Sequence, residues 1–233
     1  MPDAPRPDRL WAVVPLKSPQ HAKTRLADQL DAAQRRWLLF ELATRVIRAL
    51  QATDAVAEVA VATASTEIAG FAQSLGARPI LQSAETGTAA AFSAVIAQLQ
   101  AGQPQALLMI AGDLPLVTPA AIETLCAAAV DADVVVVPDR HRIGTNALLC
   151  SPPSAITPLF GPDSLHRHLA AARRRELRTR VLESDALSLD LDEPDDLDEL
   201  RRRGSDLDDA LRAALAGAPV PFRGADEAGR RRR

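Results

Sequence analysis

The sequence has few aromatic residues, few cysteines and no long apolar segment. Only 3 % of its 233 residues are aromatic and none is tyrosine, which argues against a surface that binds single-stranded nucleic acid by base stacking. The net charge of −3 points the same way, because a nucleic-acid surface needs an excess of basic residues. No segment holds about 18 consecutive apolar residues, so we expect no membrane-spanning helix and no membrane partner.

The two cysteines, Cys126 and Cys150, lie far apart and not in a CxxC arrangement. A disulfide framework and a zinc site would each need more cysteines. We expect both to be buried as small apolar side chains. The N-terminal residues contain no apolar segment of the kind found in secretory signals, and we expect a cytoplasmic protein.

Apolar residues make up 47 % of the chain, which is typical of a globular protein. The length suits one domain with a sizeable core. We place that domain at residues 9–217 and expect residues 1–8 and 218–233 to be disordered tails, because the last segment has no hydrophobic periodicity.

Apolar segments typical of strands alternate with segments of helical periodicity along the chain. We expect Asp31, Thr118 and either Ser65 or Thr66 to cap helices. The alternation with short connections predicts an α/β fold, with a mostly parallel central sheet covered by helices on both faces. The predicted strands are 10–16, 57–63, 77–81, 105–113, 132–138, 145–150 and 186–192, and the predicted helices are 31–50, 67–75, 86–100, 118–130, 163–175 and 193–203.

Polar residues gather where three of the predicted strands end. Lys17 follows the first strand, Asp113 ends the fourth, and Asp190 and Asp192 end the last. Ligands of open parallel sheets bind outside the carboxyl ends of the strands. Two acidic ends and one cationic loop at one edge suit a nucleoside triphosphate with Mg²⁺, since carboxylates hold the metal and cations neutralise phosphate.

Asp113 lies in the segment "AGDLPL", where a buried strand runs into a turn stiffened by Pro115. Gly112 allows the backbone to approach a ligand closely. An aspartate at a turn can also simply accept a hydrogen bond from its own backbone. Its position at a strand end favours a functional carboxylate.

The acidic segment "LSLDLDEPDDLDEL" offers a second metal carboxylate. Asp190 and Asp192 are two residues apart and would share one face of a strand. Asp192 can instead cap the helix that follows, and the acids beyond it are solvated residues that suit the first turn of a helix. We choose Asp190 as the metal ligand, with Asp192 as the alternative.

The loop "VVPLKSPQHAKTRL" carries three cations, Lys17, Lys23 and Arg25, within nine residues. Such a group can be an ordinary solvated surface. Its place after the first strand favours phosphate binding by side-chain charges, in a loop that lacks the glycines of a backbone phosphate cradle.

These segments carry a resemblance. The sequences "VVPLKSPQHAKTRL", "AGDLPL", "GTNALL", "LFGPDSLHRH" and "DLDEPDDL" occur in the order seen in the CofC family, which the chain resembles over about residues 11–200. Members are phospholactate or phosphoenolpyruvate guanylyltransferases of coenzyme F420 biosynthesis, with a GT-A-like fold. The first segment is specific to this family, whereas the acidic segments are shared with many nucleotidyltransferases.

The resemblance implies transfer of GMP from GTP to a phosphorylated three-carbon acid, with release of pyrophosphate. It implies Mg²⁺ on Asp113 and Asp190. Phosphate charge would be neutralised by Lys17, Lys23 and Arg25. GTP would be contacted by Pro15, Leu16, Lys17, Thr86, Gly87, Thr88 and Gly112. The acceptor would be contacted by Thr145, Asn146, Gly161 and Ser164.

One segment departs from the family pattern. The turn before the helix at 86–100 reads "TGTAAAF", where the family has a sequence like "GLNAA", so that Ala89 replaces an asparagine. Gly87 and Thr88 remain to approach the base and ribose. The strictness of the preference for GTP is therefore left open.

The acceptor segments have the chemistry that an anionic ligand needs. Hydroxyl groups and glycine supply neutral donors, and Ser164 begins a predicted helix, whose N-terminus favours anions. Ser164 or Asp163 can also be a helix cap and no more. His166 and His168 are two apart on that helix and point in different directions, so we expect surface residues or residues behind the site rather than a metal pair.

Two other functions compete with the guanylyltransferase. One is a different nucleotidyltransferase of the same fold, of the molybdenum-cofactor or sugar-phosphate type, although those families have a glycine-rich first loop that is absent here. The other is a non-catalytic nucleotide-binding regulatory protein. The sequence also leaves open whether 2-phospholactate, phosphoenolpyruvate or 3-phosphoglycerate is the acceptor, whether a downstream transferase consumes the labile product, and whether the protein is a homodimer.

Overall fold

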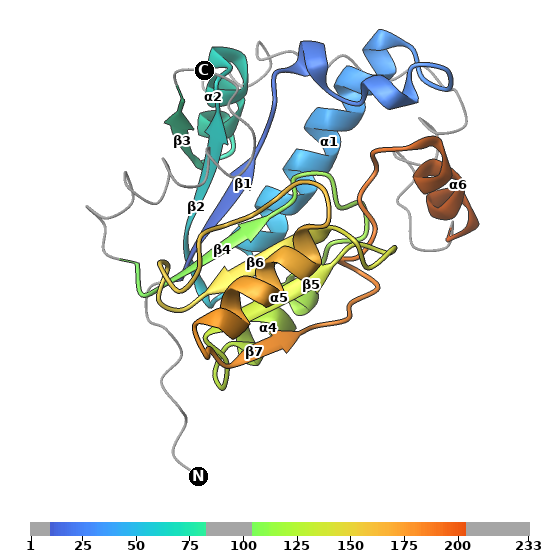
Figure 1. Ribbon diagram of the computed structural model, residues 1–233. Coiled ribbons are helices and arrows are strands. Elements are labelled where there is room, and N and C mark those ends of the chain that lie inside the picture. The colour runs from blue at the N-terminus through green and yellow to red at the C-terminus, as the bar shows by residue number, and fades with distance from the viewer. Residues whose placement is uncertain (1–9, 83–103, 204–233) are drawn as a thin grey trace.

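The structure is a computed structural model that describes residues 10–82 and 104–203. In this part of the chain one seven-stranded sheet has the order β3-β2-β1-β4-β6-β5-β7 (Figure 1). Its strands are β1 Leu10–Pro15, β2 Val56–Thr63, β3 Arg78–Leu81, β4 Ala106–Ile110, β5 Val134–Pro138, β6 Thr145–Cys150 and β7 Thr179–Val181. Of these, β6 runs antiparallel to its neighbours β4 and β5, and the other pairs are parallel. The predicted mostly parallel sheet is confirmed.

The helices α1, α2 and α4 begin where the sequence predicts caps. The side chain of Asp31 accepts a hydrogen bond from the Gln34 N–H, and Ser65 and Thr118 cap α2 and α4 in the same way. The helices are α1 Ala32–Gln51, α2 Thr66–Ser74, α4 Pro119–Ala128, α5 Ser164–Arg174 and α6 Pro194–Arg202, with short 3-10 helices η1 Pro19–His21 and η2 Thr24–Leu26.

Each strand sends alternate side chains to the two faces of the sheet, and each face has its own core. Ala12 and Val14 of β1 pack in a cluster with residues of α1, α2 and α4, whereas Trp11 and Val13 pack with residues of α5. Figure 1 shows α5 in front of the β5–β6 part of the sheet and α4 behind it. The expectation of helices on both faces is therefore confirmed.

The prediction of a strand at 186–192 is wrong. Leu187, Leu189 and Leu191 are all buried, which explains the alternating pattern, but the segment joins no ladder. The sheet position beside β5 is taken by β7, which is only three residues long and largely exposed, so its sequence has no apolar pattern to reveal it. Leu189 and Leu191 instead pack in a cluster with residues of the first loop, α1 and α6, and the Leu191 N–H donates to the carbonyl of Asp113 at 3.3 Å.

Some predictions concern residues that the structure does not describe. The helix at 86–100 and the site residues Thr86, Gly87 and Thr88 lie outside the described residues, as do both predicted tails. The domain boundaries at 9 and 217 stay predictions for the same reason. Among the residues described, no helix is both long and apolar enough to cross a membrane.

Candidate active site

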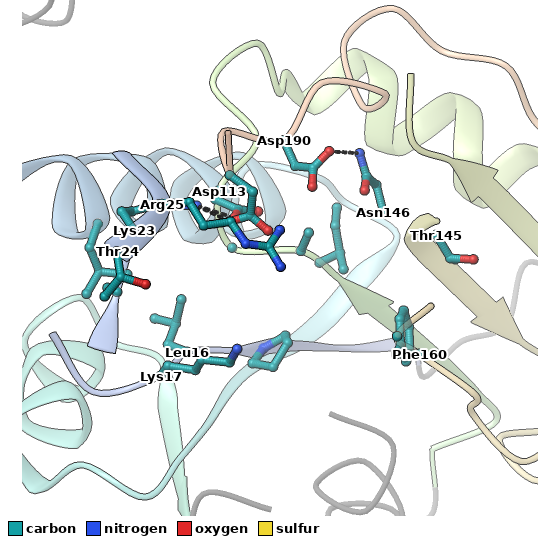
Figure 2. Close-up of a pocket in the computed structure, with 18 residues that line it drawn as sticks. Leu16, Lys17, Lys23, Thr24, Arg25, Asp113, Thr145, Asn146, Phe160 and Asp190 are labelled. Carbon is teal, nitrogen blue, oxygen red and sulfur yellow. Dashed lines mark hydrogen bonds and ion pairs between the residues drawn. The ribbon is translucent and has the colours of Figure 1, made fainter. Parts of the chain in front are cut away.

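A cavity of about 450 Å³ opens at the edge of the sheet where β1 and β4 end and β6 begins. This size is typical of small-molecule sites. Figure 2 shows the cations of the first loop and Asp113 on one side, and Thr145 and Phe160 on the other. The lining residues are Pro15, Leu16, Lys17, Ala22, Lys23, Thr24, Arg25, Leu39, Ile110, Ala111, Gly112, Asp113, Thr145, Asn146, Phe160, Gly161, Asp190 and Asp192.

The loop after β1 turns Lys23 into this cavity. The Leu16 N–H donates to the carbonyl of Ala62 at 2.9 Å, which holds the start of the loop against β2. Lys23 has the left-handed backbone angle φ 55°, and only 5 % of its side chain is exposed. That conformation costs a non-glycine residue roughly 1 kcal/mol. Contacts of the buried ammonium group therefore have to offset it.

Those contacts are with two carboxylates from distant segments. The Lys23 ammonium donates to Asp113, and to Oδ1 of Asp192 at 3.1 Å. Burial alone lowers the pKa of Lys23, but the charges of Asp113 and Asp192 outweigh it and leave the pKa above its ordinary value. Lys23 therefore carries its positive charge inside the cavity. The first loop meets Asp113 after β4, as expected, and it meets Asp192 in a segment that is not a strand.

Asp190 supplies a third carboxyl group beside this pair. Burial, together with the charges of Asp113 and Asp192, raises its pKa to about 7. Three carboxyl groups, from Asp113, Asp190 and Asp192, line the cavity together with Lys23. A further cation placed among them would stabilise their ionised forms.

The residues present fit a Mg²⁺ ion that is shared with a ligand. The described residues contain no ready-made group of three His, Cys, Asp or Glu side chains around one metal position. The Lys23 ammonium nevertheless lies between Asp113 and Asp192, which shows that this position accepts positive charge. Protein-bound Mg²⁺ commonly takes one or two carboxylates and completes its shell with phosphate oxygens and water.

Asn146 anchors the segment that carries Asp190. Its side-chain amide donates to the carbonyls of Leu187 at 3.0 Å and Ser188 at 2.9 Å, and lies 3.3 Å from Oδ1 of Asp190. Asn146 is 3 % exposed. Its geometry is that of a clamp on the 187–190 segment, and its predicted contact with substrate stays a prediction.

Asp192 is held by a second clamp. Oδ2 of Asp196 accepts from the backbone N–H of Asp192 at 3.0 Å and of Glu193 at 2.7 Å. Arg140 donates from Nε to the other oxygen of Asp196 at 2.8 Å. The N-cap of α6 is Glu193, and Asp196 completes a capping box with it, so Asp192 itself is not the cap. Asp196 is only 6 % exposed, and the expectation of a solvated acid there is wrong.

Arg25 and Lys17 lie at the open side of the cavity. The Arg25 side chain is 69 % exposed and pairs with Glu193 at 3.0 Å. Lys17 is exposed and has no carboxylate partner among the residues described. Lys17 and Lys23 are the only lysines in the sequence, and both line this cavity.

Gly112 is required by packing at the strand end. A Cβ atom there would lie 2.5 Å from Cδ2 of Leu16 and 3.0 Å from Cγ1 of Val14. The glycine therefore lets the end of β4 lie against the start of the first loop. This contact brings Asp113 and the loop cations to one place.

The residues predicted to bind the acceptor substrate differ in whether they line the cavity. Thr145 and Gly161 line the cavity, and Gly161 has φ 111°, a conformation that favours glycine. Ser164 is 2 % exposed, lies at the start of α5 and is not among the lining residues. Asp163 precedes α5 without a capping hydrogen bond from its side chain.

The lining residues that the sequence does not identify are Ala22, Thr24, Leu39, Ile110, Ala111 and Phe160. Thr24 and Phe160 are next to residues that the sequence assigns to the site, and this adjacency is the signal that could identify them. Leu39 comes from a helix face that reads as ordinary core. His168 is fully buried behind Thr145, whereas His166 is exposed and contacts Asp163.

Comparison with known proteins gives the family. A model described as "Guanylyl transferase CofC like" matches residues 10–212. The chain belongs to this family. The CofC relatives include a phosphoenolpyruvate guanylyltransferase of Conexibacter woesei, 38 % identical over 193 residues that cover 82 % of this chain and 86 % of the relative.

Two further CofC relatives carry different acceptor names. A phosphoenolpyruvate guanylyltransferase of Chloroflexus aggregans is 40 % identical over 79 % of this chain and 93 % of the relative. A 3-phospho-D-glycerate guanylyltransferase of Colwellia psychrerythraea is 31 % identical over 81 % of this chain and 89 % of the relative. The relatives that this chain resembles are therefore named for two different acceptors, phosphoenolpyruvate and 3-phospho-D-glycerate.

Solved structures confirm the fold. A nucleotidyl transferase from Methanothermobacter thermautotrophicus gives a TM-score of 0.61 at 17 % identity and covers 88 % of this chain and 99 % of its own. A protein from Desulfovibrio desulfuricans, named provisionally as a nucleotide-diphospho-sugar transferase, gives a TM-score of 0.71 at 14 % identity. The match covers 89 % of this chain and 92 % of that protein. At these identities the likeness supports the nucleotidyltransferase fold and nothing finer.

Proposed function

We propose that this CofC protein transfers GMP from GTP to a phosphorylated three-carbon acid and releases pyrophosphate. The names of the curated relatives support the reaction and the acceptor class. The structural observation that carries the proposal is the Lys23 ammonium held between Asp113 and Asp192 inside the cavity. It brings a triphosphate-binding loop and the candidate metal carboxylates to one place.

The charged side of the cavity receives the triphosphate. Lys17 and Arg25 are exposed at its rim and meet the phosphates first, and Lys23 lies deeper, beside Asp113. Mg²⁺, held by Asp113 and Asp190 with Asp192 as an alternative ligand, would supply positive charge to the phosphate oxygens. The protein as a whole is acidic, so these local cations concentrate the anionic reactants at one site.

The chemical step needs no protein base. A phosphate oxygen of the acceptor, already ionised at pH 7, attacks the α-phosphorus of GTP and forms a new phosphorus–oxygen bond. The bond from the α-phosphorus to the bridging oxygen breaks, and pyrophosphate leaves with the electron pair. The side chains align the reactants and offset charge on the leaving group, which are effects of positioning and electrostatics.

The neutral side of the cavity receives the acceptor. Thr145 and Gly161 offer donors without charge, and Phe160 provides an apolar wall. Phosphoenolpyruvate, 3-phosphoglycerate and 2-phospholactate share a phosphate and a carboxylate on three carbons, so all three remain candidate acceptors. Entry of the product into coenzyme F420 biosynthesis, a cytoplasmic location and a homodimeric state stay predictions.

An acceptor screen tests the proposal. The purified protein is incubated with GTP, Mg²⁺ and each of the three acids, pyrophosphate release is followed, and the guanylylated product is identified by mass spectrometry. We expect release that depends on both Mg²⁺ and one of these acids. If no acid supports release above the rate without acceptor, the proposal is wrong.

The same screen separates the competing functions. Faster turnover of CTP or another triphosphate, or of a sugar phosphate, would indicate a different nucleotidyltransferase of this fold. Nucleotide binding without pyrophosphate release under any condition would indicate a regulatory nucleotide-binding protein. Substituting Lys23 by alanine should abolish release in the proposed enzyme while the circular dichroism spectrum is retained.

A further inference from the structure

His168 of α5 is buried directly behind the neutral wall of the cavity. None of its surface is exposed. Its Nδ1 lies 3.1 Å from Oγ1 of Thr145, and its Nε2 accepts the backbone N–H of Leu159 at 2.8 Å. The ring also packs edge-on against Phe160, with ring centroids 5.1 Å apart. Because Thr145 and Phe160 line the cavity, His168 connects two parts of its wall.

The contact with Leu159 determines the tautomer of His168. A backbone N–H can only donate, so Nε2 must carry a lone pair. Burial, together with the charge of Arg167, lowers the pKa of His168 to about 4, and the ring is therefore neutral at pH 7. A neutral imidazole carries one proton, which must then lie on Nδ1 and point toward Oγ1 of Thr145.

This arrangement fixes the role of the Thr145 hydroxyl group. Since Oγ1 accepts the Nδ1 proton of His168, the hydroxyl proton of Thr145 is left to be donated elsewhere. Within 10–82 and 104–203, Oγ1 of Thr145 has no hydrogen-bond partner other than His168. Thr145 borders the cavity, where a phosphate or carboxylate oxygen would accept that proton.

We propose that His168 is a positioning residue, which orients the Thr145 hydroxyl as a donor to an anionic group of the acceptor and holds the Leu159–Phe160 segment beside it. The inference rests on the proposed function, because the acceptor is the ligand assigned to this wall. His168 itself touches no reactant. It acts through Thr145, so its loss should weaken acceptor binding and leave GTP binding unchanged.

Two substitutions separate the two hydrogen bonds of the ring. In His168→Asn the amide nitrogen takes the approximate position of Nδ1 and can still donate to Thr145. In His168→Gln the amide oxygen takes the approximate position of Nε2 and can still accept from Leu159, but the donor to Thr145 is lost. A matched control is His166→Gln, because His166 is exposed on the same helix two residues away.

The Michaelis constants for acceptor and for GTP are measured for each variant, with melting temperatures alongside. We expect His168→Gln to raise the acceptor KM about 5- to 10-fold with little change in the GTP KM, as for loss of one neutral hydrogen bond. His168→Asn, which keeps the donor to Thr145, should retain most of the wild-type acceptor affinity. His166→Gln should match the wild type. Equal effects of the asparagine and glutamine variants on both KM values would overturn the proposal.

A double substitution tests whether His168 acts through Thr145. In a Thr145→Val background the hydroxyl is absent, so His168→Gln should no longer change the acceptor KM. Additive effects of the two substitutions would show that His168 acts by another route and would overturn the proposal.

Nitrogen-15 NMR of the imidazole ring provides a measurement that does not depend on turnover. We expect a neutral ring at pH 7 with the proton on Nδ1, and a proton on Nε2 would overturn the inference. A wild-type protein that uses no three-carbon acid would refute the proposed function. A wild-type enzyme that does use one, but whose acceptor KM is insensitive to His168→Gln, would refute this inference alone.

Discussion

The two sides of the cavity are built by different means. On one side, Lys23, Asp113 and Asp192 come from segments about 90 and 169 positions apart along the chain and are held together by opposite charges. On the other side, Thr145 and Phe160 are uncharged and are held from behind by the neutral ring of His168. Under the proposed function, the charged side would exchange its internal cation for a bound one, and the neutral side would bind the acceptor without such an exchange.

This difference has a physical reason. Charges that are buried in pairs are costly to separate, so a ligand must replace each contact that it breaks. A triphosphate with its metal brings both signs of charge and can do so. A small acid brings only negative charge, and neutral donors can bind it without first losing a charged partner. The following predictions test this division, from the largest expected effect to the smallest.

The largest effect is expected for Asp113→Asn on the charged side. The substitution keeps the shape of the side chain but removes the charge that faces Lys23 and the candidate metal. We expect the rate of pyrophosphate release to fall by at least about 1,000-fold. Asp198→Asn is the control, because Asp198 is exposed on α6 and its ion pair is local, with Arg201 on the same helix. Turnover within about tenfold of wild type in the Asp113 variant would exclude a metal-binding role for it.

A pH effect on stability is expected from His168 on the neutral side. Its folded pKa of about 4 lies below the ordinary value of 6.5, so the unfolded chain binds the proton more readily. The neutral ring therefore contributes fully above pH 6.5, and stability is lost as the pH falls toward 4, by up to about 3 kcal/mol. Urea unfolding at pH 7 and pH 4.5 should show a larger loss for wild type than for His168→Gln. An equal loss of unfolding free energy in wild type and His168→Gln would mean that His168 does not titrate in this pH range.

A smaller effect is expected from Asn146, which holds the segment carrying Asp190. Asn146→Ala leaves the carbonyls of Leu187 and Ser188 without their donor, at a cost of about 2 kcal/mol in the free energy of unfolding. Chemical denaturation measures this directly. A substrate contact with no clamping role would instead leave stability unchanged and raise only the acceptor KM.

A further, smaller effect concerns the internal cation, the Lys23 ammonium group. Lys23→Met removes the ammonium group that lies between the carboxylates, so a free metal ion no longer competes with it. We expect Mn²⁺ to bind about tenfold more tightly than to wild type in the absence of nucleotide, as measured by electron paramagnetic resonance. Lys17→Met should change this affinity little, because Lys17 has no carboxylate partner in the described part of the chain. Unchanged or weaker binding to the Lys23 variant would contradict a cation site at this position.

The sequence predicts the charged side of the cavity better than the neutral side. Lys17 and Asp113 follow strands that the sequence identifies, and the edge of a parallel sheet brings such ends together. Asp190 also lines the cavity, although its segment is not the strand that the sequence predicts. The direct contact between Lys23 and Asp113 was not predictable, because it depends on the left-handed turn at Lys23 and on the fit of Gly112 against Leu16.

The neutral side depends on contacts that leave no local pattern. His168 looks like one of two histidines on an amphipathic helix, and only the packed structure distinguishes it from His166. Segment 186–192 has the alternation of a strand, but its leucines are buried by packing against the core, including α1 and α6, and not by strand pairing. Asn146 is assigned to the acceptor from the sequence, but its hydrogen bonds to the carbonyls of Leu187 and Ser188 become visible only in the structure.

The most direct test of whether the two sides of the cavity bind different substrates uses one substitution from each side. The KM for GTP and the KM for the acceptor are both measured for each variant. Arg25→Gln removes an exposed cation of the charged rim, and Thr145→Val removes the hydroxyl of the neutral wall without changing its size. We predict that Arg25→Gln raises the KM for GTP a few-fold and leaves the acceptor KM unchanged, and that Thr145→Val raises the acceptor KM about tenfold and leaves the GTP KM unchanged. If each substitution instead raises both constants equally, the two sides do not bind separate substrates and the account is wrong.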